Sequence, residues 1–176
     1  MRLDGGRWAQ IYDEDCGGTD CSAYVAASRP DRTWMIWGKP YPAEPPQIAT
    51  VVKYWEGGSW HNVDERPPHL TGPMWVGGDR DVWVMELNDH VPNQLFHYDG
   101  KWTEVHLDID PSAVWGRSPS DVWVVGKLGY VSHWNGAAWA DDKTPTEAGL
   151  LAVTGTANGE VWAVGEKGVI MHFVPE

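Results

Sequence analysis

The chain is poor in cysteine and in basic residues, and it has no long hydrophobic run. Its 176 residues include 2 Cys, and 13 Lys and Arg stand against 25 Asp and Glu, giving a formal net charge of −12. Nucleic acids and anionic membrane surfaces are bound through clustered Lys and Arg, so we exclude nucleic acid as a partner. A membrane-spanning helix needs about 20 consecutive apolar residues, and no such run is present.

The two cysteines lie close together, as Cys16 and Cys21 around a Gly-Gly pair. Their spacing differs from the C-x-x-C of redox and zinc sites, and no second pair completes a set of four zinc ligands. We therefore predict a small structural disulfide that closes one loop. A disulfide favours a periplasmic, cell-surface or secreted location. No signal peptide is visible in the sequence, so this location requires that the signal was removed from the chain.

Tryptophan is in excess, and it follows a repeat. There are 13 Trp but only 2 Phe. The passages DRTW at 31–34, DVW at 81–83, DVW at 121–123 and EVW at 160–162 place their Trp residues at intervals of 49, 40 and 39. The first three copies are each followed by an aromatic, an acid or amide, a Gly and a further Trp. A period of about 40–45 residues with several short strands is typical of β-propeller blades.

Each repeat divides into four short β segments. Val, Trp and Tyr alternate with small or polar residues, and Asp-Gly or Asn-Gly pairs mark hairpins. We therefore predict an all-β fold, a small β-propeller with four blades of four antiparallel strands in a single domain, and with the first strand of each blade nearest the axis. The expected blades are 22–63, 71–106, 112–141, and 150–174 completed by 3–12.

The last repeat ends after its third strand, and the chain begins with what resembles the missing fourth. Leu3–Ile11 carries the Asp-Gly turn and Trp8 at the position that opens the fourth strand in the other copies. An unpaired strand edge favours aggregation, so we expect the N-terminal strand to close the ring of a monomer. A head-to-tail dimer of eight blades uses the same complementarity and stays open as the alternative.

The pattern VWG…SxxDVW(A/V)VG…HW(D/N)GxxW resembles a Trp-rich repeat common in secreted proteins and lipoproteins of environmental bacteria. It is more distantly similar to Asp-box propellers and to photosystem-assembly-factor-like propellers. The resemblance covers nearly the whole chain and implies propeller blades, while it implies no activity. The Asp-box S-x-D-x-G-x-T-W is not matched, so no sialidase-type catalytic residue is carried over.

Most aromatic residues and histidines fall on repeat positions, and we assign them to packing. Twelve of the Trp residues fit the repeat and are expected to fill the space between blades. His97, His133 and His172 share one position on the third strand, with Tyr54 in the remaining copy. They would point into separate blades, so we expect structural hydrogen bonds to neighbouring turns and no metal ring. Trp37 lies outside the pattern.

Function is expected where the repeat is irregular, because sites are grafted onto scaffolds in surface loops. The connection between the second and third strands is short in two repeats, 127–129 and 166–168, but long in the others, 38–47 and 87–93. We predict a ligand site on this loop-rich face of blades 1 and 2, with Trp37 and Tyr41 as aromatic surfaces. Its residues are Trp37, Tyr41, Glu44, Glu65, Arg66, His69, Asp89, His90 and Asn93.

The predicted function is a non-catalytic binding or interaction module outside the cytoplasm, taking a glycan, as a lectin does, or a protein. One alternative is a metal-dependent or carboxylate-based hydrolase that uses the same face, and another is a structural repeat within a larger assembly. Asp13, Asp15 and Asp20 offer oxygen ligands suited to calcium but lack EF-hand spacing. No other cofactor is predicted. Neither a phosphate-binding loop nor a G-x-S-x-G or H-E-x-x-H motif is present, which favours binding over catalysis.

Overall fold

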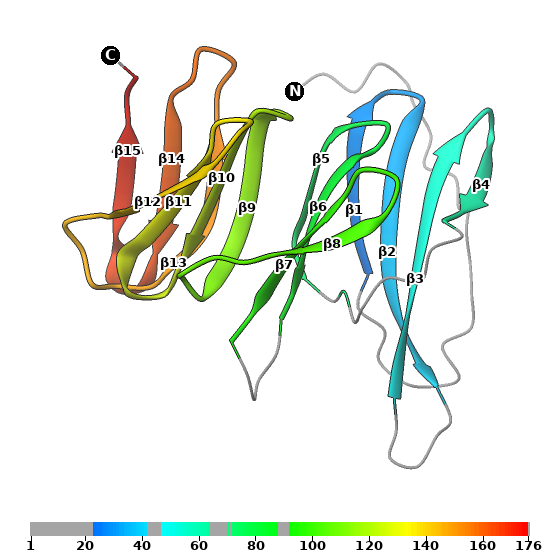
Figure 1. The fold of residues 1–176 in the computed structure, drawn as a ribbon, viewed down its shortest axis with the longest axis horizontal. Coiled ribbons are helices and arrows are strands. Elements are labelled where there is room, and N and C mark those ends of the chain that lie inside the picture. The colour runs from blue at the N-terminus through cyan, green and yellow to red at the C-terminus, as the bar shows by residue number, and fades with distance from the viewer. Residues whose placement is uncertain (1–22, 42–46, 64–69, 71, 88–91, 176) are drawn as a thin grey trace.

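The computed structural model describes residues 23–41, 47–63, 70, 72–87 and 92–175. In these ranges the chain forms four antiparallel sheets that stand side by side in chain order (Figure 1). We call them blades 1 to 4. No helix of the described residues is long and apolar enough to cross a membrane.

The strands follow the chain order within each blade. Blade 1 contains β1 (Ala23–Arg29), β2 (Arg32–Tyr41), β3 (Gln47–Glu56) and β4 (Ser59–Asn62), and blade 2 contains β5 (Met74–Gly78), β6 (Asp81–Glu86), β7 (Gln94–Tyr98) and β8 (Trp102–Val105). Blade 3 contains β9 (Pro111–Ser118), β10 (Asp121–Gly126), β11 (Tyr130–Trp134) and β12 (Trp139–Lys143), and blade 4 contains β13 (Leu150–Gly155), β14 (Val161–Gly165) and β15 (Ile170–Phe173). Single 3-10 turns, η1 (Lys127–Gly129) and η2 (Glu166–Gly168), join the second and third strands of blades 3 and 4.

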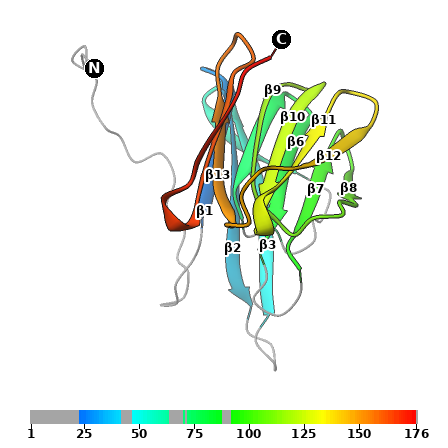
Figure 2. The ribbon, with the colours of Figure 1, turned by 90° about the vertical axis from the view of Figure 1, so that its left-hand side faces the viewer.

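The all-β class and the division into four sheets are confirmed. Blade 4 has three strands in the described residues, as the last repeat predicts. Residues 3–12, the predicted fourth strand of that blade, lie outside the described residues, so ring closure stays a prediction. Figure 2, viewed from the blade 4 side, shows the orange and red strands of this blade in front of the other sheets.

The first strands of the blades lie against one another: β1 contacts β5, β5 contacts β9, and β9 contacts β13. Their approach is close because a Gly of one blade meets a Trp of the blade before it. A Cβ added at Gly116 would lie 2.7 Å from the Trp75 ring, and one added at Gly155 would lie 2.4 Å from the Trp115 ring. The Trp residues of β5 and β9 therefore set the spacing from blade 2 to blade 3 and from blade 3 to blade 4.

Each pair of neighbouring blades encloses its own apolar cluster. Ile36 of blade 1 packs with Val84 of blade 2, and Met85 of blade 2 packs with Val124 of blade 3. The third cluster, between blades 3 and 4, includes Val125 and is smaller. One face of each of blades 1 to 3 thus packs on the next blade in chain order.

Candidate functional site

A motif of one acid, one Trp and one His recurs across the second and third strands. In blade 2 the carboxylate of Asp81 accepts hydrogen bonds from Trp83 Nε1 at 2.9 Å and from His97 Nε2 at 2.7 Å. The indole and imidazole rings stack with their centroids 4.0 Å apart. We call this arrangement the acid–Trp–His motif.

Blade 3 repeats the motif with nearly the same geometry. Asp121 accepts from Trp123 Nε1 at 2.9 Å and from His133 Nε2 at 2.8 Å, and the two rings lie 4.0 Å apart. The other carboxylate oxygen of Asp121 pairs with Arg117 Nε at 2.7 Å. The hydrogen bonds of His97 and His133 to acids next to the turn confirm the structural role predicted for these two histidines. No group of three or more His, Cys, Asp or Glu in the described ranges is placed to hold a metal ion.

Blade 1 departs from the motif. Trp34 pairs with Tyr54 as Trp83 pairs with His97, so Trp34 is the equivalent of Trp83. The residue two positions before Trp34 is Arg32, whereas the other blades have an acid at that position. Asp31, the acid of the DRTW passage, lies one residue further from its Trp than the acids of the other blades do. The guanidinium of Arg32 lies 3.7 Å from the centre of the Tyr54 ring. Trp34 Nε1 is buried and has no hydrogen-bond partner within the described part of the chain.

Charged residues link blades 1 and 2 near this substitution. Arg29 lies 2.8 Å from Asp31 and 3.1 Å from Asp79, and Arg32 Nη1 lies 2.8 Å from Glu56. Desolvation lowers the pKa of Arg29 and the carboxylates of Asp31 and Asp79 raise it by more, so the net shift is upward. The pairs of Arg29 are exposed, and exposed ion pairs contribute about 0–1 kcal/mol each, so we interpret the Arg29–Asp79 contact as a surface link between the two blades. Arg32, in contrast, is buried.

The acid–Trp–His motifs lie near the turns that join the first and second strands of each blade. The connections between the second and third strands lie at the opposite ends of the strands, and we call this end of the blades the loop-bearing side. It includes the long connection predicted at 38–47, whose described residues, 38–41 and 47, are paired as strands. Beyond the pair of Ile36 with Val52, five more residue pairs follow, ending with Tyr41 and Gln47. Blades 3 and 4 turn at once after the equivalent pair. At about 3.3 Å per residue, the β2–β3 hairpin extends the sheet by roughly 16 Å, and Figure 1 shows it projecting below the other blades.

Three predicted site residues fall within the described strands and loops. Trp37 is only 4% exposed, so it does not present an aromatic surface to a ligand as predicted. Tyr41 ends β2 near the tip of the projecting hairpin. Asn93 donates from Nδ2 to the Pro111 carbonyl at 2.8 Å, and its backbone N–H donates to the carboxylate of Asp110 at 3.1 Å, so it joins blades 2 and 3.

The other predicted residues lie outside the described residues and stay predictions. They are Glu44, Glu65, Arg66, His69, Asp89 and His90 of the ligand site, Cys16 and Cys21 of the disulfide, and Asp13, Asp15 and Asp20 of the calcium site.

Next to Asn93 the loop-bearing side has a shallow hollow of about 400 Å³. Gln94 Nε2 donates to Glu104 Oε1 at 2.7 Å on its wall, and His106 Nδ1 lies 3.6 Å from the same oxygen. The sequence argument missed Glu104 and His106 because they lie on and after a regular fourth strand. Only the fold brings them beside the connection that precedes β7.

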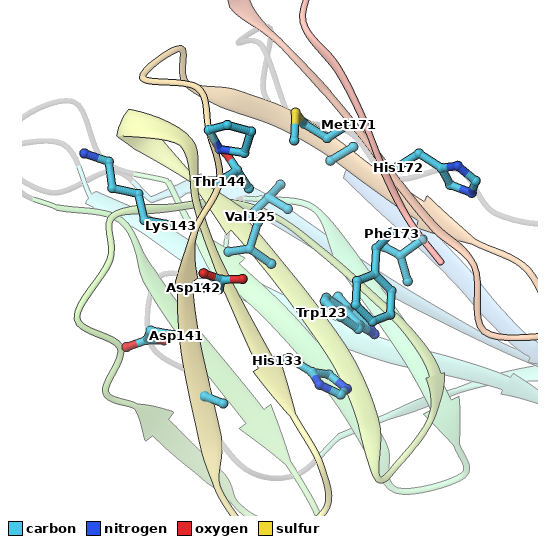
Figure 3. Close-up of a pocket in the computed structure, with 15 residues that line it drawn as sticks. Trp123, Val125, His133, Asp141, Asp142, Lys143, Thr144, Met171, His172 and Phe173 are labelled. Atoms are coloured by element: carbon cyan, nitrogen blue, oxygen red, sulfur yellow. The ribbon is translucent and has the colours of Figure 1, made fainter. Parts of the chain in front are cut away.

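A second hollow is a groove of about 410 Å³ between blades 3 and 4 (Figure 3). Trp123 and Phe173 face each other at one end, with ring centroids 4.8 Å apart. Val125 and Met171 form apolar walls, and Lys143 lies on the outer rim.

The interface between blades 2 and 3 shows what normally fills this groove. There Trp83 is covered by Trp134 and Trp139, with ring centroids 6.4 Å and 5.6 Å away. In blade 4 Phe173 holds the register position of Trp134, and no described residue takes the place of Trp139. The predicted fourth strand would bring Trp8 there, which stays a prediction.

No known protein family matches the chain, and no curated protein sequence matches it. Solved structures do. A structure described as YCF48 bound to D1 peptide aligns with 98% of this chain and 70% of its own, with a TM-score of 0.54 and 14% sequence identity. At this identity the likeness concerns the fold alone. It supports a propeller-like arrangement of the four sheets.

Proposed function

We propose that the chain is a non-catalytic module that binds a partner protein through the loop-bearing side of blades 1 and 2, outside the cytoplasm. The observation that carries the proposal is the β2–β3 hairpin, which continues five residue pairs beyond the point where blades 3 and 4 turn. A paired hairpin that projects from a rigid sheet presents a defined surface at little cost in conformational entropy.

A polypeptide ligand is favoured over a glycan, because Trp37, the aromatic candidate for stacking on a sugar, is buried. The projecting part of the hairpin is itself paired β structure, and strands at the edge of a sheet can take up an added strand of a polypeptide. The propeller neighbour YCF48 is described as bound to a peptide, which agrees with this choice.

The hairpin can be shortened without touching the core. Replacing residues 40–48 by Asn-Gly, a favoured two-residue turn, would close the hairpin at the pair of Lys39 with Ala49. Leu128→Asn is the matched control, because Leu128 lies in the η1 turn of blade 3 at a φ of 58°, which Asn tolerates.

The measurement is affinity capture from an extract of the native host, with each captured protein then titrated against purified wild type and variants. The proposal expects a defined protein that binds wild type and the Leu128→Asn control and whose affinity falls at least about tenfold, or 1.4 kcal/mol, in the shortened variant. Equal binding by all three proteins would place the site elsewhere. Binding on a glycan array without a protein ligand would replace the proposal by a lectin function.

A further inference from the structure

The first and last blades each leave an apolar face in solvent. On blade 4, Ile170 is 68% exposed, and Val164 and Trp162 beside it are also exposed. On blade 1, Val25 is 66% exposed and stands between the exposed Ala23 and Ala27. We call these the blade 4 end face and the blade 1 end face. Among the sheets that the described residues form, none lies in front of blade 4 in Figure 2.

The blade 4 end face corresponds to the surface that every earlier blade buries against the next. Val164 lies two residues after Trp162. The same position in blades 1 to 3 is held by Ile36, Met85 and Val125, whose side chains are fully buried. Each belongs to the apolar cluster shared with the following blade.

The partner of Val164 across the sheet shows the same contrast. Ile170 pairs with Val164 as Val52 pairs with Ile36 and as Leu95 pairs with Met85. Both Val52 and Leu95 are buried. The blade 4 end face is therefore built as an interface for a further sheet.

The blade 1 end face corresponds to the surface that each later blade packs against the blade before it. Val25 pairs with the residue that follows the anchor Trp, as Met74, Val114 and Val153 do in blades 2 to 4. Each of these three packs against the blade before it. Val25 thus stands at the position that receives a preceding blade, and no sheet of the described residues occupies that place.

We propose that the blade 4 end face of one copy of this chain packs on the blade 1 end face of a second copy, head to tail. Val164 and Ile170 would cover Val25, repeating a sheet-on-sheet contact that the chain makes three times internally. The two surfaces differ, so the contact is heterologous, and two such contacts form a closed eight-sheet ring when their rotation closes. The loop-bearing side of blades 1 and 2 lies apart from both end faces, so the proposal is independent of the proposed function.

The test is the mass of the 176-residue chain in solution, read by native mass spectrometry and by sedimentation over a range of concentrations. Val25→Asp and Ile170→Asp each place a carboxylate in one end face, and both side chains are exposed in the single chain, so folding should be kept. Leu128→Asp is the control, because Leu128 is equally apolar and exposed but lies in the η1 turn.

We expect a dimer for wild type and control and a monomer for each end-face variant, because every junction needs both faces. A mixture of Val25→Asp and Ile170→Asp has one intact junction, blade 4 of the first on blade 1 of the second, while its other junction carries both carboxylates. It should therefore form an open 1:1 heterodimer that is weaker than the wild-type ring.

Three outcomes would overturn the proposal. A wild-type monomer whose melting temperature falls in both variants would show that the end faces close on each other within one chain. A wild-type monomer with unchanged melting temperatures would show that both faces stay in solvent. A dimer that persists in both variants would use another surface.

Discussion

Blades 2 and 4 place the same residue types, an acid, a Trp and a His, at the positions of the acid–Trp–His motif but in different surroundings. In blade 2, Trp83 is 3% exposed and Asp81 lies 2.7 Å from His97, whereas in blade 4, Trp162 is 39% exposed and Glu160 lies 3.9 Å from His172. The ring stacking hardly differs, at 4.0 Å and 3.7 Å between centroids. Pairing across the two strands therefore suffices to set the stacking, while burial depends on the next sheet.

The sharpest contrast is expected between Trp83→Ala and Trp162→Ala. Trp83 fills the space between blades 2 and 3, so its removal should lower the free energy of unfolding by about 3–5 kcal/mol. Trp162 is 39% exposed in the single chain, so its loss should lower that free energy by less, about 1–2 kcal/mol. Urea denaturation of both variants at low protein concentration measures the difference. Equal losses would contradict the burial difference seen in the single chain.

A concentration series gives the control for this first contrast. If end faces of two copies pack together, the loss caused by Trp162→Ala should grow with protein concentration, whereas the loss caused by Trp83→Ala should show no such growth. A concentration-independent pair of values would assign the whole contrast to the single chain.

The sheets could be predicted from the sequence because residues that recur at the same repeat position also occupy the same position in the strand pairing. A Trp on the second strand and a His or Tyr on the third recur at paired positions in all four blades, so the order of strands and the short last blade followed. Gly-rich turns fixed the hairpins. Residue types and spacing alone were sufficient for these features.

The errors concern blade 1, where the repeat is interrupted. DRTW has one residue more than DVW before its Trp, and only cross-strand pairing shows that Arg32 takes the place of the acid. Trp37 stands outside the repeat and was assigned to the surface, yet it is buried. The sequence places Lys39 and Pro40 in a loop, yet both belong to β2. Pro cannot donate a hydrogen bond to a neighbouring strand, so within a sheet it is tolerated mainly at an edge. Burial and pairing of unrepeated residues depend on tertiary contacts, which no local pattern records.

The second contrast concerns the acids of the two motifs. Asp81→Ala would leave the donors of Trp83 and His97 without their shared acceptor, and each buried donor left unpaired costs about 1–3 kcal/mol. We expect a loss of about 2 kcal/mol in the free energy of unfolding. Glu160→Ala breaks a partly exposed pair at 3.9 Å, and such pairs contribute at most about 1 kcal/mol. Thermal and urea unfolding of both variants decide the matter, and a larger loss for Glu160→Ala would reverse the interpretation.

The smallest expected effect tests how blade 1 manages without the acid. Arg32 takes that position, its guanidinium covers the Tyr54 ring at 3.7 Å, and its Nη1 pairs with Glu56 at 2.8 Å. Arg32→Met keeps most of the buried volume but removes the charge, so the cation–π contact is lost, which is worth about 0.5–2 kcal/mol. Glu56 is half exposed and regains water, so we expect a net loss of about 1 kcal/mol.

Tyr54→Phe is the matched control for Arg32→Met, because it keeps an aromatic face under the guanidinium. It should leave stability nearly unchanged, and the double variant should lose no more than Arg32→Met alone. If Arg32→Met instead left the free energy of unfolding unaltered, the Arg32–Tyr54 contact would not stabilise blade 1 in place of the missing acid. Blade 1 would then resemble blade 4, held in register by strand pairing and stabilised by the apolar cluster it shares with its neighbour.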